Sequence, residues 1–369
     1  MNNVLIIFSS GDLGGAEKSL TRMAKNSRGL PEIALCTMGS VGAWSKWAEE
    51  LNLQPIVLNK KMRKNYNSFN ISTIWNLVKL IRERNFNILY VIGFRASIVV
   101  RFLRLFLKNI KIIHGIRWNP DSNSKLDKIL RLIEYSFGFL INLYICNSEI
   151  CAKTLTRRAG ISSEKIKVIH NGLDWTLNPY EKNNSRNNFN IVVLANISPR
   201  KGHIEFLEVI KGVCEKLPNA HFFFVGNDNN SESLIKKISL LGLNNSITLT
   251  GFQDDVRPWL EKAKIMVLPS QSSEGCPTSI IEGFAYKLPV VAYSVDGIPE
   301  LISNNCDGIL IPVGDSSAMR NSIIELLTND DLSNKMGLSG YQKVKNSFTL
   351  DQCSRKHQEV FSRLIENKF

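Results

Sequence analysis

The sequence predicts an α/β protein with two domains, each built on a doubly wound parallel sheet. Its 369 residues are more than one ordinary domain uses. Short apolar runs alternate with longer stretches of helical periodicity, which is typical of parallel strands joined by helices. Around residues 178–190 the composition changes to Asn, Pro, Ser and Lys, which indicates a linker, and the alternation then starts again.

Composition agrees with a soluble globular class, since 44% of the residues are hydrophobic and 21% are charged. The seven cysteines form no C-x-x-C pair and mostly lie in apolar runs, so we expect buried thiols in a reducing compartment and no zinc site. The start of the chain lacks the basic region of a signal peptide, and no apolar run reaches the length of a membrane span. The sequence therefore predicts a cytoplasmic protein.

Positive charge is concentrated in the first half of the chain. Residues 1–180 contain 26 Lys and Arg against 12 Asp and Glu, whereas residues 181–369 contain 20 against 21. Such an excess indicates an anionic partner. Nucleic acid is excluded as that partner because no recognised motif or aromatic stacking platform accompanies the charge.

The first half reads as alternating strands and helices. The predicted strands are residues 4–8, 32–38, 54–58, 88–92, 110–114, 141–146 and 165–169. Five helices are predicted between these strands. The first carries Leu20 and Met23, the next three cover residues 69–84, 96–107 and 126–140, and the last begins at the cap Asn147-Ser148. His114 ends one of these strands, at the edge where parallel sheets collect ligands.

A glycine-rich turn follows the first strand and contains Gly14 and Gly15. Such a turn lets the backbone approach a phosphate closely. It reads G-x-x-G-G rather than G-x-G-x-x-G, and the second strand ends without an acidic residue. These differences argue against an NAD site.

The second half repeats the pattern. Its predicted strands are residues 191–195, 222–225, 247–250, 265–269, 290–293 and 309–312, and a last helix covers residues 350–366. The first strand leads into Pro199-Arg200-Lys201-Gly202, which places two cations at a strand end where they can neutralise a diphosphate.

The most informative stretch is residues 270–289. An apolar strand precedes it, and Pro277, with Thr278 and Ser279 beside it, opens a helix. The start of a helix offers unpaired N–H groups and a positive dipole end, which suit a phosphate or diphosphate. Glu274 and Glu282 flank this site, and carboxylates next to an anion site make sense if they accept hydrogen bonds from sugar hydroxyls.

The E-G-x-P…E arrangement, followed by Pro289-Val290-Val291-Ala292 and Gly308-Ile309-Leu310-Ile311-Pro312, resembles retaining glycosyltransferases of family 4. The resemblance implies a GT-B fold, in which two such domains face each other across a cleft. It divides the chain into an acceptor-binding domain (residues 1–172), a nucleotide-sugar-binding domain (173–348) and a C-terminal helix (349–369) that crosses back to the first domain. It also matches His170-Asn171-Gly172-Leu173-Asp174 to the N-G-x-D signature at the domain crossover.

The resemblance assigns roles to individual residues. Glu274 accepts from the donor sugar and Glu282 from the ribose, Lys201 and Arg200 stabilise the diphosphate, and His114 lies near the transferred sugar. The family arginine five residues before the lysine is replaced here by Asn196, so Arg200 could substitute for it. The remaining donor contacts predicted are Gly14, Gly15, Gly226, Phe252, Cys276, Thr278 and Ser279.

The predicted activity is transfer of a hexose or N-acetylhexosamine from a nucleotide-diphosphate-sugar, with UDP favoured over GDP, to a saccharide or lipid-linked saccharide. No cofactor is expected beyond the donor substrate, and no metal, because the chain has no Asp-x-Asp motif. Two alternatives remain open. The chain could be a non-transferring GT-B enzyme, such as an epimerase or phosphorylase, or a silent scaffolding subunit whose basic half binds a partner.

Two basic stretches bear on a membrane partner. One is the loop Lys60–Lys64, and the other interleaves Arg95, Arg101, Arg104, Lys108 and Lys111 with apolar residues. The second stretch is either a core helix with a solvated cationic face or a surface that docks on anionic lipid.

Overall fold

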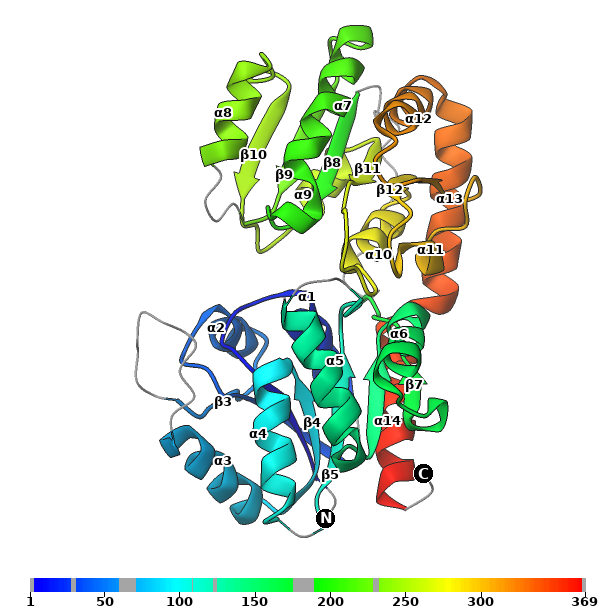
Figure 1. Cartoon of the computed structure of the whole chain (residues 1–369). Helices are drawn as coiled ribbons and strands as arrows, with labels where there is room; N and C mark the ends of the chain where they lie inside the picture. The colour runs from blue at the N-terminus through cyan, green and yellow to red at the C-terminus, as the bar shows by residue number, and fades with distance from the viewer. Residues whose placement is uncertain are drawn as a thin grey trace. The chain divides into compact units, whose positions relative to one another are not determined.

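The computed structural model describes residues 3–27, 31–59, 71–107, 109–121, 125–174, 189–227 and 232–366. The chain divides into two compact units (Figure 1). Unit 1 consists of Met1–Asp174 and Leu350–Phe369, and unit 2 of Trp175–Thr349. Each unit is built on one parallel sheet with helices on its faces, which confirms the predicted fold class.

Unit 1 contains a seven-stranded sheet in the order β3-β2-β1-β4-β5-β6-β7. Its strands are β1 (Asn3–Phe8), β2 (Glu32–Thr37), β3 (Ile56–Val57), β4 (Phe86–Ile92), β5 (Lys111–Ile116), β6 (Leu143–Cys146) and β7 (Ile166–Val168). All pairs are parallel, and β1 lies between β2 and β4. The strand order therefore reverses at β1, and ligands of such sheets bind at the carboxyl ends of the strands beside that point.

Helices cover both faces of the unit 1 sheet. One face packs against α1 (Gly15–Asn26), α2 (Ala43–Glu50) and α14 (Leu350–Ile365), and the other against α3 (Ile71–Glu83), α4 (Phe94–Arg104) and α6 (Glu149–Ala159). On the α4 face also lies α5 (Lys125–Phe137), whose Glu134 contacts α4 and β6. Successive residues of β1 point to opposite cores, since Val4 and Ile6 belong to the first and Leu5 to the second.

Unit 2 contains a six-stranded parallel sheet in the order β10-β9-β8-β11-β12-β13. Its strands are β8 (Asn190–Leu194), β9 (His221–Val225), β10 (Ile247–Gly251), β11 (Ile265–Leu268), β12 (Val290–Tyr293) and β13 (Gly308–Ile311). Its helices are α7 (His203–Lys216), α8 (Glu232–Leu240), α9 (Arg257–Lys262), α10 (Thr278–Ala285), α11 (Ile298–Leu301), α12 (Ser316–Thr328) and α13 (Asp330–Ser347).

Several predicted bounds were wrong by a few residues. The third strand is only Ile56–Val57, and α4 ends at Arg104 rather than at residue 107. The helix predicted over residues 126–140 ends at Phe137 and continues as a 3-10 turn, η1 (Gly138–Leu140). A Cβ at Gly138 would come within 2.6 Å of the Ile161 side chain, so Gly138 packs closely on that side chain.

Two sequence features lie outside the described residues, namely the basic loop 60–64 and residues 178–188 of the linker. Within the described ranges, no helix is both long and apolar enough to span a bilayer.

The packing of α14 in unit 1 can be tested at Phe361. This side chain is fully buried, and its ring lies edge-on to Tyr90 of β4, 6.1 Å between centroids. We expect Phe361→Ala to leave a cavity and lower the free energy of unfolding of unit 1 by about 3–5 kcal/mol. Hydrogen exchange of the β1 amides measures this loss. Lys356→Ala, at an exposed position of the same helix, is the control and should leave exchange unchanged. Unchanged β1 protection in Phe361→Ala would show that α14 does not stabilise this sheet.

Candidate active site

The candidate site of unit 2 is built at the carboxyl ends of its strands. After β8 the chain forms a 3-10 turn (Pro199–Lys201) and then reaches Gly202, which begins the turn into α7. Gly202 has a φ of 70°, and a Cβ there would lie 2.1 Å from the carbonyl oxygen of Pro269. Only glycine fits this position, and it brings the loop after β8 against the end of β11.

This close approach joins two motifs that are 73 residues apart in sequence. The backbone N–H of Gln271 donates to the carbonyl of Arg200 at 2.8 Å, and the Arg200 guanidinium reaches the carbonyl of Ser273 at 3.4 Å. Lys201 Nζ forms an ion pair with Glu274 Oε1. The side chains of Lys201 and Glu274 are only 13% and 6% exposed. Two residues that the sequence assigned to different parts of a donor therefore contact each other directly.

Burial and the Glu274 carboxylate act in opposite directions on the pKa of Lys201. Burial lowers the pKa of Lys201, the neighbouring carboxylate of Glu274 raises it, and the charge of Arg200 lowers it again. A pair of this kind is held in a medium of low polarity, where removal of one partner leaves the other charge uncompensated.

Asp296 orients Glu274 and was missed as a site residue. Its carboxylate accepts a hydrogen bond from the backbone N–H of Glu274 at 3.0 Å. Asp296 has a φ of 46°, in the left-handed region that few residues other than glycine adopt. The sequence showed only an Asp-Gly turn before a helix, and nothing in that pattern identifies the loop that the carboxylate would meet.

Helix α10 supplies the start of a helix beside this pair. Pro277 precedes it with a φ of −64° and a ψ of 114°, so the helix begins one residue later than predicted. Thr278 and Ser279 are its first two residues, and their N–H groups belong to the turn that lacks intrahelical acceptors. Cys276 is buried just before the helix, and Glu282 is half-buried one turn into it.

Three further predicted residues lie on the neighbouring strand ends. Asn196 accepts at its side-chain oxygen from the N–H of Asn227 at 3.0 Å, which ties the β8 loop to the β9 loop. A Cβ at Gly226 would come 2.3 Å from the carbonyl oxygen of Ala195, so the backbones that follow β8 and β9 also touch at this point. Phe252, directly after β10, is 44% exposed.

Two predicted glycines lie in unit 1, at the start of α1. Gly14 precedes the helix in an extended conformation, and its N–H donates to the Glu17 carboxylate at 3.2 Å. A Cβ at Gly15 would meet no atom within 4 Å. Neither backbone conformation requires glycine, and the space beside Gly15 remains open.

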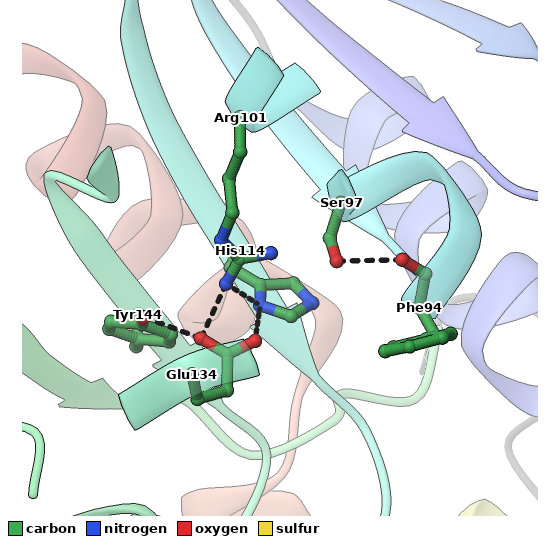
Figure 2. A network of polar contacts seen from close by, with 6 residues as sticks. All are labelled: Phe94, Ser97, Arg101, His114, Glu134 and Tyr144. Atoms are coloured by element: carbon green, nitrogen blue, oxygen red, sulfur yellow. Dashed lines mark hydrogen bonds and ion pairs between the residues drawn. The ribbon is translucent and has the colours of Figure 1, made fainter. Parts of the chain in front are cut away.

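His114 lies on β5 in unit 1 and is completely buried (Figure 2). Its Nδ1 is 3.0 Å from Glu134 Oε1. The other oxygen of Glu134 accepts hydrogen bonds from the Arg101 guanidinium and, at 2.6 Å, from the Tyr144 hydroxyl. Side chains from α4, α5, β5 and β6 thus meet at one carboxylate.

The charge states in this network follow from its composition. Burial alone would raise the pKa of Glu134, but His114, Arg101 and Tyr144 outweigh it and lower the pKa to about 2. Burial lowers the pKa of His114, and although Glu134 opposes this effect, Arg101 adds to it. We therefore describe a neutral imidazole whose Nδ1–H donates to an ionised Glu134. Its Nε2 then carries a lone pair, and this buried atom has no hydrogen-bond partner among the described residues.

The network bears on the basic stretch around α4, for which a core helix and a lipid-docking surface were both left open. Arg101 is 3% exposed and pairs with Glu134. Arg104 donates to the carbonyl of Leu140 at 2.8 Å, and Lys111 donates to the carbonyl of Leu364. Arg101 is buried, and Arg104 and Lys111 are half-buried, so the contacts of these three cations inside unit 1 favour the alternative of a core helix for this part of the stretch. Lys108 lies outside the described residues.

No group of three or more His, Cys, Asp or Glu side chains in the described part of the chain is arranged to hold a metal ion.

Two family models match the chain. Residues 13–176 match the model described as Glycosyltransferase Family 4, and residues 178–343 match the model for Glycosyl transferases group 1. Together they cover most of both units.

Curated relatives are similar over much of their length. The chain is 23% identical over 318 residues to the UDP-Gal:alpha-D-GlcNAc-diphosphoundecaprenol alpha-1,3-galactosyltransferase of Escherichia coli, covering 81% of each protein. It is 27% identical over 213 residues to the amylovoran biosynthesis glycosyltransferase AmsK of Erwinia amylovora, covering 56% of this chain and 52% of AmsK.

Solved structures share the fold. Anabaena HepE in complex with UDP-glucose has a TM-score of 0.83 at 22% identity, with 98% of this chain and 99% of HepE covered. Sucrose-phosphate synthase from Thermosynechococcus elongatus also has a TM-score of 0.83, at 15% identity over the whole of both chains.

The buried His203, next to Lys201, makes the stability of unit 2 depend on pH. Burial and the charge of Lys201 lower the pKa of His203 from 6.5 to about 4. Between these values the unfolded chain binds a proton that the folded chain does not, so stability falls as the pH is lowered from 6.5 to 4. We expect His203→Leu to remove about 3 kcal/mol of this pH dependence, measured by urea unfolding at pH 7 and pH 4. From pH 7 to pH 8 the variant and the wild type should change in parallel. An unaltered loss of stability at pH 4 in the variant would contradict this assignment.

Proposed function

The chain belongs to glycosyltransferase family 4 and has the GT-B fold, and from this premise we propose that it is a retaining hexosyltransferase that uses a UDP-sugar. The transferred group is a hexose or N-acetylhexosamine. The acceptor is a saccharide carried on a lipid diphosphate, in the synthesis of a surface polysaccharide or glycan at the cytoplasmic face of a membrane.

The observation that carries this proposal is the buried Lys201–Glu274 pair beside the start of α10. A donor diphosphate can take the place of Glu274 as the anionic partner of Lys201. Glu274 is then released to accept hydrogen bonds from hydroxyls of the donor sugar. The exchange keeps the Lys201 ammonium paired, because the incoming anion replaces the carboxylate that moves, and sugar hydroxyls then supply hydrogen bonds to that carboxylate.

The same residues support departure of the nucleotide. Negative charge develops on the diphosphate as the bond from its oxygen to the anomeric carbon breaks. Lys201, Arg200 and the N–H groups of Thr278 and Ser279 stabilise that charge, while Glu274 stabilises the oxocarbenium-like sugar. The acceptor oxygen bonds to the anomeric carbon on the same face, and its proton passes to the leaving phosphate oxygen, so the configuration is retained.

Four further predicted residues complete the proposal. Glu282, on α10, accepts from the ribose hydroxyls. Asn196 stands where the family has an arginine and is used to tie two loops together, so the exposed Arg200 substitutes for that arginine as the second cation. In unit 1, the neutral His114 offers Nε2 as an acceptor for a hydroxyl, a role that its hydrogen bond to Glu134 favours.

Relatives support the choice of substrates. The Escherichia coli relative is named for a UDP-galactose donor and a lipid diphosphate acceptor, and HepE was crystallised with UDP-glucose. Which hexose this chain transfers depends on hydrogen bonds to individual hydroxyls of the donor sugar. In our proposal, Glu274 accepts those hydrogen bonds.

A double-variant cycle tests the proposal. Lys201→Met and Glu274→Gln each leave one buried charge unpaired, so each should lower the free energy of unfolding by about 3–5 kcal/mol. The double variant removes both charges and should recover most of this stability. Transfer of label from UDP-galactose, UDP-glucose or UDP-N-acetylglucosamine into lipid-linked saccharides of a membrane extract should fall at least ~100-fold in all three variants.

The control for folding in this cycle is the double variant itself. If it regained transfer together with stability, the ion pair would be a purely structural feature, and the proposed role of both residues would be wrong.

A further inference from the structure

Exposed apolar side chains gather on one part of unit 1. Among the described residues, eleven of the seventeen large apolar side chains that are exposed lie between Ile71 and Phe139, and the other six are spread over the rest. The densest group is Phe102 on α4, Leu105 and Phe106 in the turn directly after it, Leu132 and Tyr135 on α5, and Phe139 in η1; each is between 61% and 73% exposed. We call this group the apolar face. A patch of this kind on a soluble domain marks a binding surface.

The two helices present this face together. In Figure 1, α4 and α5 lie side by side over the same face of the sheet, and the Arg101–Glu134 ion pair joins them. The exposed Phe102, near the end of α4, and Phe106, in the turn that follows the helix, have ring centroids separated by 5.3 Å. The opposite side of α4 packs on the sheet through Val100 and Leu103, so the apolar side chains of this helix point both inward and outward.

The charges on the same two helices are sorted by sign. Both of their carboxylates are buried, Asp127 at 5% exposure and Glu134 at 1%. Arg95, Lys125 and Lys128 are exposed. In the described parts of α4 and α5, the outward surface therefore combines apolar side chains with positive charge and has no exposed carboxylate.

This combination discriminates between possible partners. A second copy of the chain, paired through the same face, would bring like charges together. An anionic bilayer offers phosphates to the cations and an apolar boundary to the rings, and aromatic side chains are favoured at that boundary.

We propose that the apolar face docks on an anionic lipid bilayer, with the rings of α4 and α5 in the headgroup region and Lys125 and Lys128 at lipid phosphates. The surface differs from the one that the sequence suggested, because Arg101, Arg104 and Lys111 are used inside unit 1. The docking adds a partner to the proposed function and does not depend on which sugar or acceptor the enzyme uses.

Flotation of the full chain with vesicles tests the proposal. We expect binding to vesicles of phosphatidylcholine with phosphatidylglycerol, and at least tenfold weaker binding to phosphatidylcholine alone. The variant Phe102→Ser/Phe106→Ser/Leu132→Ser should lose at least tenfold in binding to the anionic vesicles, and so should Lys125→Gln/Lys128→Gln. The matched control Ile235→Ser/Leu240→Ser/Leu338→Ser changes three exposed apolar residues of unit 2 and should float like the wild type.

Three results would overturn the proposal: no flotation of the wild type, wild-type flotation of the Phe102/Phe106/Leu132 variant, or concentration-dependent dimers that this variant abolishes while vesicles remain unbound. The last result would assign the face to a second copy of the chain. UDP binding, measured as a rise in melting temperature, should be the same in every variant. Absence of UDP binding would contradict the proposed function, whereas loss of flotation with UDP binding intact concerns the apolar face alone.

Discussion

The ion pair between Lys201 and Glu274 is the interaction on which the candidate site depends. Taking two charges out of water costs several kcal/mol for each ion, and packed apolar residues would often stabilise a fold as well or better. Exchange of Glu274 for an anionic ligand at Lys201 would explain why the fold keeps this ion pair in spite of its cost. Gly202 makes the contact possible because it lets the two loops approach, and Asp296 fixes the backbone that carries the carboxylate. The left-handed backbone of Asp296 places its carboxylate at the Glu274 N–H, and strain of this kind is commonly retained where it positions a functional group.

A second carboxylate, Glu134, organises the buried side chains of unit 1. It holds Arg101, His114 and Tyr144, which come from three different elements, and it sets the imidazole tautomer. The two sites follow one principle. In each, a buried carboxylate is paired with a cation inside a parallel α/β unit.

The alternation of apolar runs and helical stretches was enough to predict both sheets, because parallel strands that are buried on two faces read as short continuous apolar runs. Element ends were harder to predict. The helix ends at Phe137, where Gly138 packs closely on Ile161, a residue 23 positions later that the local helical pattern does not include. Arg200, Lys201, Glu274 and Glu282 were each predicted as donor contacts from their residue types and their positions beside strand ends and a helix start. That Lys201 and Glu274 touch could not be predicted, since their contact depends on how two loops 73 residues apart meet at the sheet edge. For the same reason the sequence left open whether Arg101 belongs to a core helix or to a lipid-docking surface, because the helical pattern of α4 gives no sign of the carboxylate that α5 brings to it.

The most direct test of the central claim is a crystal structure of the protein with a UDP-sugar. The account predicts that the donor diphosphate lies at the start of α10, that Lys201 Nζ has left Glu274 for a phosphate oxygen, and that the Glu274 carboxylate accepts from a hydroxyl of the sugar. Donor density away from residues 274–282, with the Lys201–Glu274 pair still closed, would contradict it.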